Sequence, residues 1–409
     1  MRTESDARRS SGSHVHMRTR IAFWSIVLPA VNVASVVAEA QVPSAPVEVR
    51  VPYVPILVTG ADGAAHLAYE LHVTNVHAST GILSLDRLEV FGGRDASALV
   101  TYGVAELDER VMHADAERET RLRHSRAVES GRRAVAHVWV TAPTTEAERL
   151  RDLTHRLVFI DDKGREQLVD DVPLHVGRRA PPVLATPLRG GLWLVHNGPG
   201  NHLSPHWGSV VAWNGRTTVP QRFAVDFIGL DENGGAVRGD FRTSANQDWV
   251  GFGAEVVAVA DGVVREMQDG VIDHAPLVEP DPPAVLTAAA LYGNHVVLDL
   301  GSNTFVHYAH LQRNSVTVNV GQRVRRGQVL GRLGNSGNTN APHLHFHVSD
   351  SASFGGSEGD PFVIDSFDLI GETTAERAIT EGAALDVSPT PKRSRHRQLP
   401  LDGMIVRFP

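Results

Sequence analysis

Residues 342–348 read PHLHFHV, and this stretch decides the fold expected for the second half of the chain. Side chains alternate between the two faces of a strand, so His343, His345 and His347 would share one face while the apolar residues between them face a core. Neutral imidazole is a common zinc ligand. The pattern therefore predicts either a metal site or the solvated face of an amphipathic strand, and the preceding sequence favours the metal site.

Three upstream segments precede this strand in a characteristic order. Asp226 lies in QRFAVDF (221–227), residues 308–311 read YAHL, and residues 327–338 are rich in glycine. In this order the segments resemble the lysostaphin/LytM-type zinc metallopeptidases, which carry an upstream His and Asp, a Y-x-H-L, a glycine-rich stretch and then P-H-x-H-F. The resemblance covers roughly residues 187–370, under half of the chain.

The resemblance implies a zinc-dependent endopeptidase that hydrolyses the peptide cross-links of bacterial peptidoglycan. Asp226 and His345 would be zinc ligands. His310 and His343 would form a catalytic pair that orients water and stabilises the developing oxyanion. Zinc would activate the water and polarise the scissile carbonyl, and a neighbouring neutral His would act as the general base.

Other polar residues near the motif have supporting roles in this interpretation. Tyr308 is a second candidate for a hydrogen bond to the oxyanion. His347 would be an outer partner of a metal ligand. His295 and His307 are expected to be ordinary histidines on strand surfaces.

The sequence departs from the family pattern at Arg222, which stands four residues before Asp226 where the family has its first His ligand. Catalytic zinc normally has three protein ligands, so another residue must supply the third. His206 and His202 are the candidates, since a hairpin predicted over residues 210–219 would fold their segment back toward Asp226. The register does not decide between them. A branch of the family resembles this chain in having a His at about the spacing of His206, which we prefer. Arg222 would then be placed to hold a substrate carboxylate.

Two other functions are compatible with parts of the pattern. The altered first ligand allows a non-catalytic module of the same fold that binds cell wall or activates another hydrolase. A serine hydrolase using Ser336 is disfavoured, because residues 334–337 do not form the G-x-S-x-G elbow and no strand-to-helix pattern surrounds them.

The predicted fold is mainly β throughout. Alternating residues at 67–73 and 134–140, with turn signals between strands, predict a β-sandwich-like accessory domain over residues 41–180. A lysostaphin-type antiparallel β peptidase domain is expected over 187–370. Residues 371–409 read as a polar linker followed by a C-terminal strand.

The first 40 residues have the pattern of a secretion signal. Arginines precede an apolar run over residues 21–38, and Ala38-Glu39-Ala40 fits a small-x-small cleavage site. We therefore expect export to the periplasm or cell envelope, or release outside the cell, and no stable membrane span after cleavage.

Composition limits the partners of the exported chain. Removing residues 1–40, which hold five arginines and three acidic residues, changes the net charge from −8 to −10. That charge argues against nucleic acid as a general partner. Peptidoglycan peptides are the expected partner, and the 41–180 region would orient the catalytic groove or bind a protein. The sequence has no cysteine, so His and acidic residues must hold any metal.

Overall fold

A computed structural model describes most of the chain after the predicted signal segment, and its largest compact unit is Val42–Pro409. The described residues are 42–93, 95–113, 125–281, 287–373, 379–387 and 393–409. The signal-peptide prediction for residues 1–40 lies outside them. No helix among the described residues has the length and apolar character needed to cross a bilayer.

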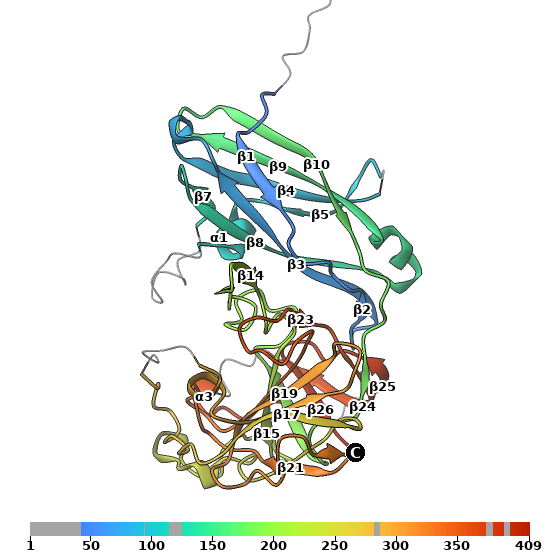
Figure 1. Cartoon of the computed structure of the whole chain (residues 1–409), viewed down its shortest axis with the longest axis vertical. Coiled ribbons are helices and arrows are strands. Elements are labelled where there is room, and N and C mark those ends of the chain that lie inside the picture. Colours follow the sequence, from blue (N-terminus) through green and yellow to red (C-terminus); the bar gives the residue numbers. More distant parts are fainter. Residues whose placement is uncertain (1–41, 94, 114–124, 282–286, 374–378, 388–392) are drawn as a thin grey trace, which may run out of the picture. The chain divides into compact units, whose positions relative to one another are not determined.

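Residues 42–180, here called the N-terminal β-region, form two five-stranded sheets (Figure 1). One sheet has the order β1-β3-β8-β6 with β2 paired to β3, and its strands are β1 (Val47–Arg50), β2 (Val58–Thr59), β3 (Ala64–Asn75), β6 (Val111–His113) and β8 (Arg133–Pro143). The other has the order β10-β9-β4-β5 with β7 paired to β4, and its strands are β4 (Leu83–Gly92), β5 (Ala98–Tyr102), β7 (Ala127–Val128), β9 (Asp152–Asp161) and β10 (Glu166–His175). Helix α1 (Val104–Arg110) and two 3-10 turns, Ala78–Thr80 and Thr144–Leu150, connect strands.

The two sheets enclose one hydrophobic core, which is the arrangement of a sandwich. Leu67, Tyr69 and Leu71 of β3 alternate into this core, and Leu85 of β4 and Leu157 of β9 meet them from the other sheet. The expected alternation in the first half of the chain is therefore present, and the burial of these residues explains why the strands form.

Residues 181–409, here called the C-terminal β-region, contain a twelve-stranded sheet with the order β11-β24-β26-β12-β15-β22-β19-β18-β17-β20. Its strands are β11 (Val183–Leu184), β12 (Leu192–His196), β15 (Val225–Leu230), β17 (Gly262–Gln268), β18 (Asn294–Asp299), β19 (Phe305–Leu311), β20 (Arg323–Val324), β22 (Leu344–Ser349), β24 (Val363–Glu372) and β26 (Met404–Arg407). Two more strands pair off this path, β23 (Gly359–Asp360) with β22 and β25 (Arg393–Gln398) with β24.

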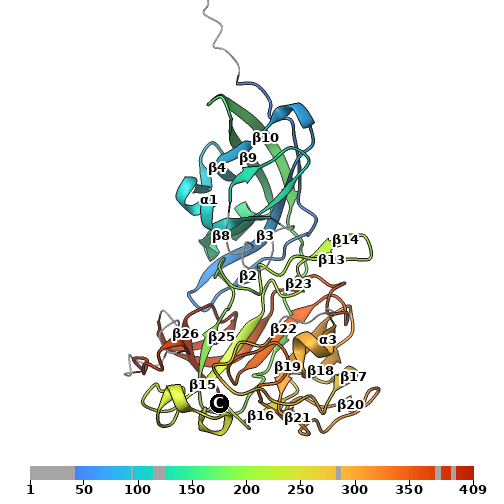
Figure 2. The same ribbon diagram turned by 90° about the vertical axis from the view of Figure 1, so that its left-hand side faces the viewer.

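Smaller elements complete the C-terminal β-region (Figure 2). Two antiparallel two-stranded sheets stand apart from the large sheet: β13 (Val211–Trp213) with β14 (Arg216–Thr218), and β16 (Glu255–Val257) with β21 (Val329–Arg332). The helical elements are α3 (Ala288–Tyr292) and two 3-10 turns, Phe241–Thr243 and Asn246–Asp248. The expectation of a mainly β chain is confirmed.

Strand β22 lies between β15 and β19 and has the predicted alternation. Leu344, Phe346 and Val348 are buried in the main hydrophobic core, which leaves the histidines between them on the opposite face. The register pairs His345 with Asp226 of β15. The sheet therefore places the Asp and the second His of the motif side by side.

The structure corrects two predictions about strand arrangement. The predicted hairpin over 210–219 exists as β13–β14 with a two-residue turn at Asn214-Gly215, but it does not pair the His206 segment with Asp226. The ladder neighbour of Asp226 on that side is His196 of β12. Residues 371–397 are also not simply a linker, because β24 extends to Glu372 and β25 pairs with it.

Candidate metal centre

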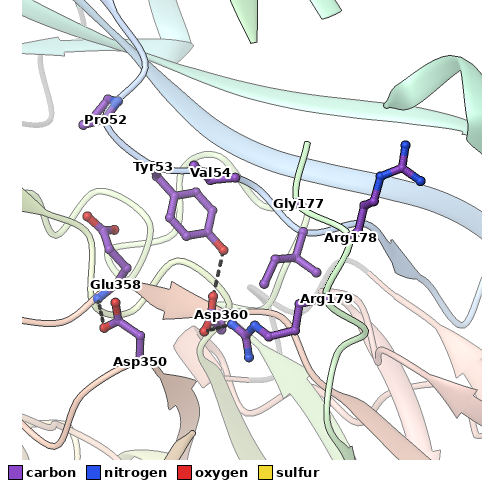
Figure 3. A pocket seen from close by; sticks show the side chains of 10 residues that line it. Pro52, Tyr53, Val54, Gly177, Arg178, Arg179, Asp350, Glu358 and Asp360 are labelled. Atoms are coloured by element: carbon purple, nitrogen blue, oxygen red, sulfur yellow. Dashed lines mark hydrogen bonds and ion pairs between the residues drawn. The ribbon is translucent and has the colours of Figure 1, made fainter. Parts of the chain in front are cut away.

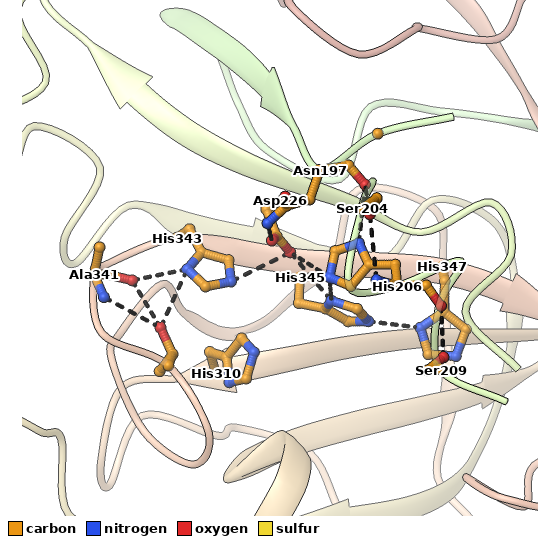
Figure 4. Close-up of polar contacts among 12 residues, drawn as sticks. Asn197, Ser204, His206, Ser209, Asp226, His310, Ala341, His343, His345 and His347 are labelled. Carbon is orange, nitrogen blue, oxygen red and sulfur yellow. Dashed lines mark hydrogen bonds and ion pairs between the residues drawn. The ribbon is translucent and has the colours of Figure 1, made fainter. Parts of the chain in front are cut away.

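Three buried ligand atoms meet above the large sheet: His206 Nε2, Asp226 Oδ1 and His345 Nδ1 (Figure 4). His345 Nδ1 lies 3.1 Å from Asp226 Oδ1 and 3.2 Å from His206 Nε2. His206 Nε2 lies 3.4 Å from the same carboxylate oxygen. Asp226 and His345 come from paired strands, whereas His206 comes from the segment between β12 and β13.

His206 is aimed at Asp226 by hydrogen bonds within its own loop. Its Nδ1–H donates to the carbonyl of Asn197 at 3.0 Å, which leaves Nε2 with a free lone pair. Ser204 supports the turn, since its hydroxyl donates to the same carbonyl and accepts from the backbone N–H of His206. The loop therefore fixes the ring orientation that a metal ligand needs.

Asn197 also contacts the second ligand, and sequence reasoning missed it. Its side-chain amide donates to Asp226 Oδ2 at 3.0 Å, so one residue orients both His206 and Asp226. Its backbone has φ of 51°, in the left-handed region that Asn tolerates better than most residues. The only sequence signal was the dipeptide Asn197-Gly198, which is typical of a turn.

The far side of His345 rests on a row of buried histidines. His345 Nε2 lies 2.9 Å from His347 Nδ1, so the ring can donate there while Nδ1 faces Asp226. The ring of His347 stacks on His307 with centroids 4.1 Å apart. The expectation that His295 and His307 lie on strand surfaces is wrong, because both are buried.

Two further histidines face the same centre. His343 donates through Nδ1 to the carbonyl of Ala341 at 2.7 Å, and its Nε2 lies 3.3 Å from Asp226 Oδ1. His310 donates through Nδ1 to the carbonyl of Ser336 at 2.8 Å. Their ring centroids are 4.7 Å apart. Each ring therefore has Nδ1 occupied and Nε2 available on the metal side.

A break in strand alternation brings His310 to this face. Regular alternation would place it on the same face as Tyr308, which lies in the main core. His310 instead has φ of 60°, a left-handed conformation that is uncommon for a residue other than glycine. The residue is thus redirected toward His343, and such an outlier is a feature that functional sites often contain.

Two residues with expected supporting roles lie elsewhere. Tyr308 is in the core, where its hydroxyl accepts from the backbone N–H of Val259 at 3.0 Å, so it does not face the centre. Arg222 is fully engaged: its guanidinium donates to Glu70, to Glu358 and to the carbonyl of Gly359. It is therefore not available to a substrate carboxylate.

His202 is directed away from the ligand cluster. Its Nε2 lies 3.2 Å from Glu109 of α1, and it does not belong to the group of ligand atoms around Asp226. Of the two histidines considered for the first ligand, the structure brings His206 to the cluster.

Burial and charge set the protonation of the centre. Burial raises the pKa of Asp226, but the charges of His206 and His343 and the hydrogen bonds of His343 and His345 outweigh it and hold that pKa well below its usual range. Burial lowers the pKa of His206 to about 4 despite the nearby carboxylate. At neutral pH the cluster therefore offers a carboxylate and a neutral imidazole, the forms that bind zinc.

The two facing histidines differ in basicity. Burial, helped by the charges of His343 and His345, lowers the pKa of His310 well below its usual range. Burial also opposes protonation of His343, but the charge of Asp226 and a hydrogen bond to it raise the pKa of His343 overall. At neutral pH His310 is thus a neutral imidazole whose Nε2 has a free lone pair, whereas His343 holds a proton more readily.

The model of peptidase family M23 matches residues 247–355. This chain carries a peptidase family M23 domain. The matched segment includes His310, His343 and His345 but begins after Asp226, so the family model does not reach the first two residues of the ligand cluster. The resemblance to lysostaphin-type metallopeptidases is confirmed at the level of the family.

Curated relatives match this chain over short segments. Peptidoglycan DD-endopeptidase ShyA of Vibrio cholerae is 41% identical over 56 residues, 14% of this chain and 13% of the relative. Peptidoglycan DD-endopeptidase ShyC of the same species is 29% identical over 111 residues, 27% of this chain and 21% of the relative. Glycyl-glycine endopeptidase ALE-1 of Staphylococcus capitis is 37% identical over 73 residues, 17% and 20% of the two chains. The chain thus spans at most about a fifth of the length of these relatives.

Solved structures of M23 proteins are also similar. The catalytic domain of lysostaphin from Staphylococcus simulans shares 22% identity and covers 31% of this chain and 86% of its own, with a TM-score of 0.19. The M23 metalloprotease pseudoalterin shares 15% identity and covers 54% of this chain and 100% of its own, with a TM-score of 0.25.

A cavity of about 620 Å³ opens over the ligand cluster. Its described lining contains His310, His343 and the ring of Tyr292, which stacks on His345 with centroids 5.9 Å apart. Among the described lining residues the acidic ones are Asp226 and Glu279, and there is no Lys or Arg. A cavity of this size accommodates a short peptide segment beside the ligand atoms.

The donor set of the ligand cluster fits a catalytic zinc ion. His206, Asp226 and His345 offer two imidazole nitrogens and one carboxylate oxygen within 4.8 Å of one another. The other polar atoms of these side chains are held by Asn197 and His347. Three protein ligands beside an open cavity are the arrangement of catalytic zinc, whereas a structural site would be closed by a fourth protein ligand.

Proposed function

We propose that the chain is a zinc-dependent endopeptidase that hydrolyses peptide cross-links of bacterial peptidoglycan. The observation that carries this proposal is the convergence of His206, Asp226 and His345 below a cavity that two further histidines, His310 and His343, also face. The substrate class is supported by the relatives, which are named as peptidoglycan and glycyl-glycine endopeptidases. Export to the periplasm or cell envelope would bring the enzyme to that substrate.

In this proposal His206, Asp226 and His345 hold the metal ion. Zinc at such a site supplies Lewis acidity, which makes water nucleophilic near neutral pH and polarises a carbonyl. The ligands' own partners, Asn197 and His347, keep the coordinating atoms pointed inward. His347 is fully buried behind His345.

His310 would transfer the proton of the attacking water, and His343 would stabilise the negative charge that develops on the carbonyl oxygen. His310 is kept neutral by burial and has its Nδ1–H committed to Ser336, so Nε2 accepts the proton of the attacking water as general base. The same proton then passes to the leaving amine. His343, whose pKa is raised, presents Nε2–H as a donor to the oxygen of the scissile carbonyl.

The alternative, a non-catalytic wall-binding or hydrolase-activating module, depended on the missing His at position 222. His206 Nε2 lies beside Asp226 and offers a third ligand, which removes the main argument for that alternative. We also propose a domain boundary between residues 180 and 187, supported by the core that the two N-terminal sheets enclose and by a second core that lies mainly in the C-terminal β-region.

Zinc content and release of peptides from purified peptidoglycan test this proposal together. The parent protein should hold one zinc ion and release cross-linked peptides. His345→Ala and His206→Ala should each lose both properties, because catalytic zinc needs three protein ligands. His202→Ala is the matched control in the same loop and should keep both, because an ion pair with the exposed Glu109 contributes little. A parent protein that binds no zinc and cuts nothing when zinc is supplied would exclude the enzyme and leave the binding module.

A further inference from the structure

A single buried carboxylate links the N-terminal β-region to the metal centre. Glu70 lies in β3 and is completely buried. It accepts a hydrogen bond from Trp207 Nε1 at 2.6 Å. It also accepts from Arg222 Nε at 2.8 Å and from an Arg222 terminal nitrogen at 2.7 Å. Trp207 and Arg222 both belong to the C-terminal β-region, so Glu70 holds two segments of the other region at once.

Those two segments carry two of the three candidate ligands. Trp207 directly follows His206, and Arg222 stands four residues before Asp226. No strand is assigned between β12 and β13, so the His206 loop lacks a ladder of hydrogen bonds to fix its position. Besides the hydrogen bonds within the loop, contacts with neighbouring segments therefore contribute to its position.

The N-terminal β-region supplies several of these contacts. The indole of Trp207 is buried and packs edge-on against His137 and Trp139 of β8, with centroids 5.4 and 6.0 Å apart. His202 of the same loop pairs with Glu109 of α1 at 3.2 Å. The loop that presents His206 thus lies against the sandwich along much of its length.

Arg222 is held as firmly on its other side. Its guanidinium also pairs with Glu358 at 2.8 Å and lies 3.7 Å from the ring centroid of Tyr53, a residue of the N-terminal β-region. Tyr53 in turn donates to Asp360 at 3.0 Å (Figure 3). A buried guanidinium requires such complete pairing, because an uncompensated charge in the interior is strongly unfavourable. The segment leading into Asp226 is therefore anchored where the family usually has a ligand.

We infer that Glu70 is a positioning residue of the metal centre, which sets the placement of His206 and Asp226 through Trp207 and Arg222. This inference rests on the proposed function, because it concerns the same metal site. It assigns the N-terminal β-region a specific role: the sandwich completes the outer support of the centre, so the two regions act as one catalytic unit. Arg222 then anchors its segment at the position where the family usually has a His ligand. The third ligand, His206, lies instead on the loop that Glu70 holds through Trp207.

The test compares Glu70→Gln with Asp161→Asn in the full chain. The amide at position 70 keeps the shape of the side chain but loses the charge and the second acceptor oxygen that Arg222 uses. Asp161 is a matched control, since it is a buried carboxylate of the same region that pairs with Arg165 and not with the loop. The zinc dissociation constant is measured by competition with a chromophoric chelator, and thermal unfolding is followed separately in EDTA.

Glu70→Gln should weaken zinc binding about tenfold or more, the effect typical of an outer partner of a ligand. Asp161→Asn should leave the zinc dissociation constant unchanged, even where it lowers the melting temperature equally. Trp207→Phe, which keeps the packing but removes the Nε1–H donor, should also weaken zinc binding. The double variant should lose less than the product of the two single effects, because both act through one contact.

The outcomes separate this inference from the proposed function. If Glu70→Gln binds zinc as tightly as the parent while His206→Ala does not bind it, the inference is wrong and the proposed function stands. If Glu70→Gln does not fold, Trp207→Phe decides, and parent-like zinc affinity in that variant overturns the inference. A parent protein without zinc affinity overturns both.

Discussion

Replacing Asn197 with Gly should weaken zinc binding without disturbing the backbone of the His206 loop. The substitution removes the amide that donates to Asp226 Oδ2 at 3.0 Å. It keeps the carbonyl that accepts from His206, since Gly adopts the left-handed φ of 51° readily. A hydrogen bond to a charged group contributes about 1.5–3 kcal/mol. At about 1.4 kcal/mol per factor of ten, the zinc dissociation constant should rise about 10- to 100-fold.

A second substitution separates the donor from the backbone. Asn197→Ala removes the same amide and adds the strain of a left-handed residue with a Cβ atom, about 1–2 kcal/mol. It should lose as much zinc affinity as Asn197→Gly and be less stable by about that strain energy. Chelator competition gives the affinity, and urea unfolding of the metal-free protein gives the stability.

Asn303→Gly is the matched control for the change of residue type. Asn303 is exposed, has φ of 54° and lies in the turn between β18 and β19, away from the ligands. Its replacement should leave zinc affinity unchanged. Parent-like zinc affinity in Asn197→Gly would refute the reasoning that this amide orients Asp226.

Three further outcomes are expected. His347→Phe removes the nitrogen that pairs with the ligand histidine and should weaken zinc binding about tenfold in chelator competition. Burial raises the pKa of Asp402 to about 6 from an ordinary value of 3.8, so the folded state binds more protons and stability is lost as pH rises between these values. Asp402→Asn should remove that loss and unfold in urea with up to about 3 kcal/mol more stability at pH 7. Gly293→Ala would place a Cβ atom 2.4 Å from the carbonyl of Ser336 and should reduce the free energy of unfolding by about 3 kcal/mol or more.

Each of these three predictions has a control and an outcome that would contradict it. His295→Phe is a matched control for His347, because His295 is buried but its Nδ1 is hydrogen-bonded to the carbonyl of Gly293 rather than to a ligand. Equal losses of zinc affinity in the two would contradict a specific role. Parallel stability profiles for parent and Asp402→Asn between pH 4 and 6 would contradict the raised pKa. Gly270→Ala, with φ of 92° and open space around its Cβ, measures backbone strain alone.

The sequence pattern was sufficient to predict the structure where side chains alternate regularly along a strand. The side chains of β22 take the faces that PHLHFHV predicts, and the register of β15 and β22 brings Asp226 beside His345. The alternating segments at 67–73 and 134–140 lie in β3 and β8, which share one core. In these strands, the identity of each residue and of its neighbours along the chain is enough to predict which side chains face the core.

Pattern was insufficient where a contact joins distant segments or breaks alternation. Tyr308 and His310 are two residues apart and were both assigned to the site, but the left-handed backbone at His310 puts them on different faces. The approach of His206 to Asp226 depends on the carbonyl of Asn197, which no hairpin register describes. Glu70 lies 152 residues before Arg222, so its pairing left no local signal.

Strand β26 is an interior strand of the large sheet, between β12 and β24, although it is the last strand described along the sequence. Leu192 of β12 pairs with Arg407, so this part of the sheet closes a loop of more than two hundred residues. Pairings over such separations form slowly, because the chain entropy must be lost before the contacts form. Until β26 arrives, β12 presents an open edge that can pair with another chain. Refolding should therefore be slow and should give lower yields as protein concentration rises, since intermolecular pairing competes with closure.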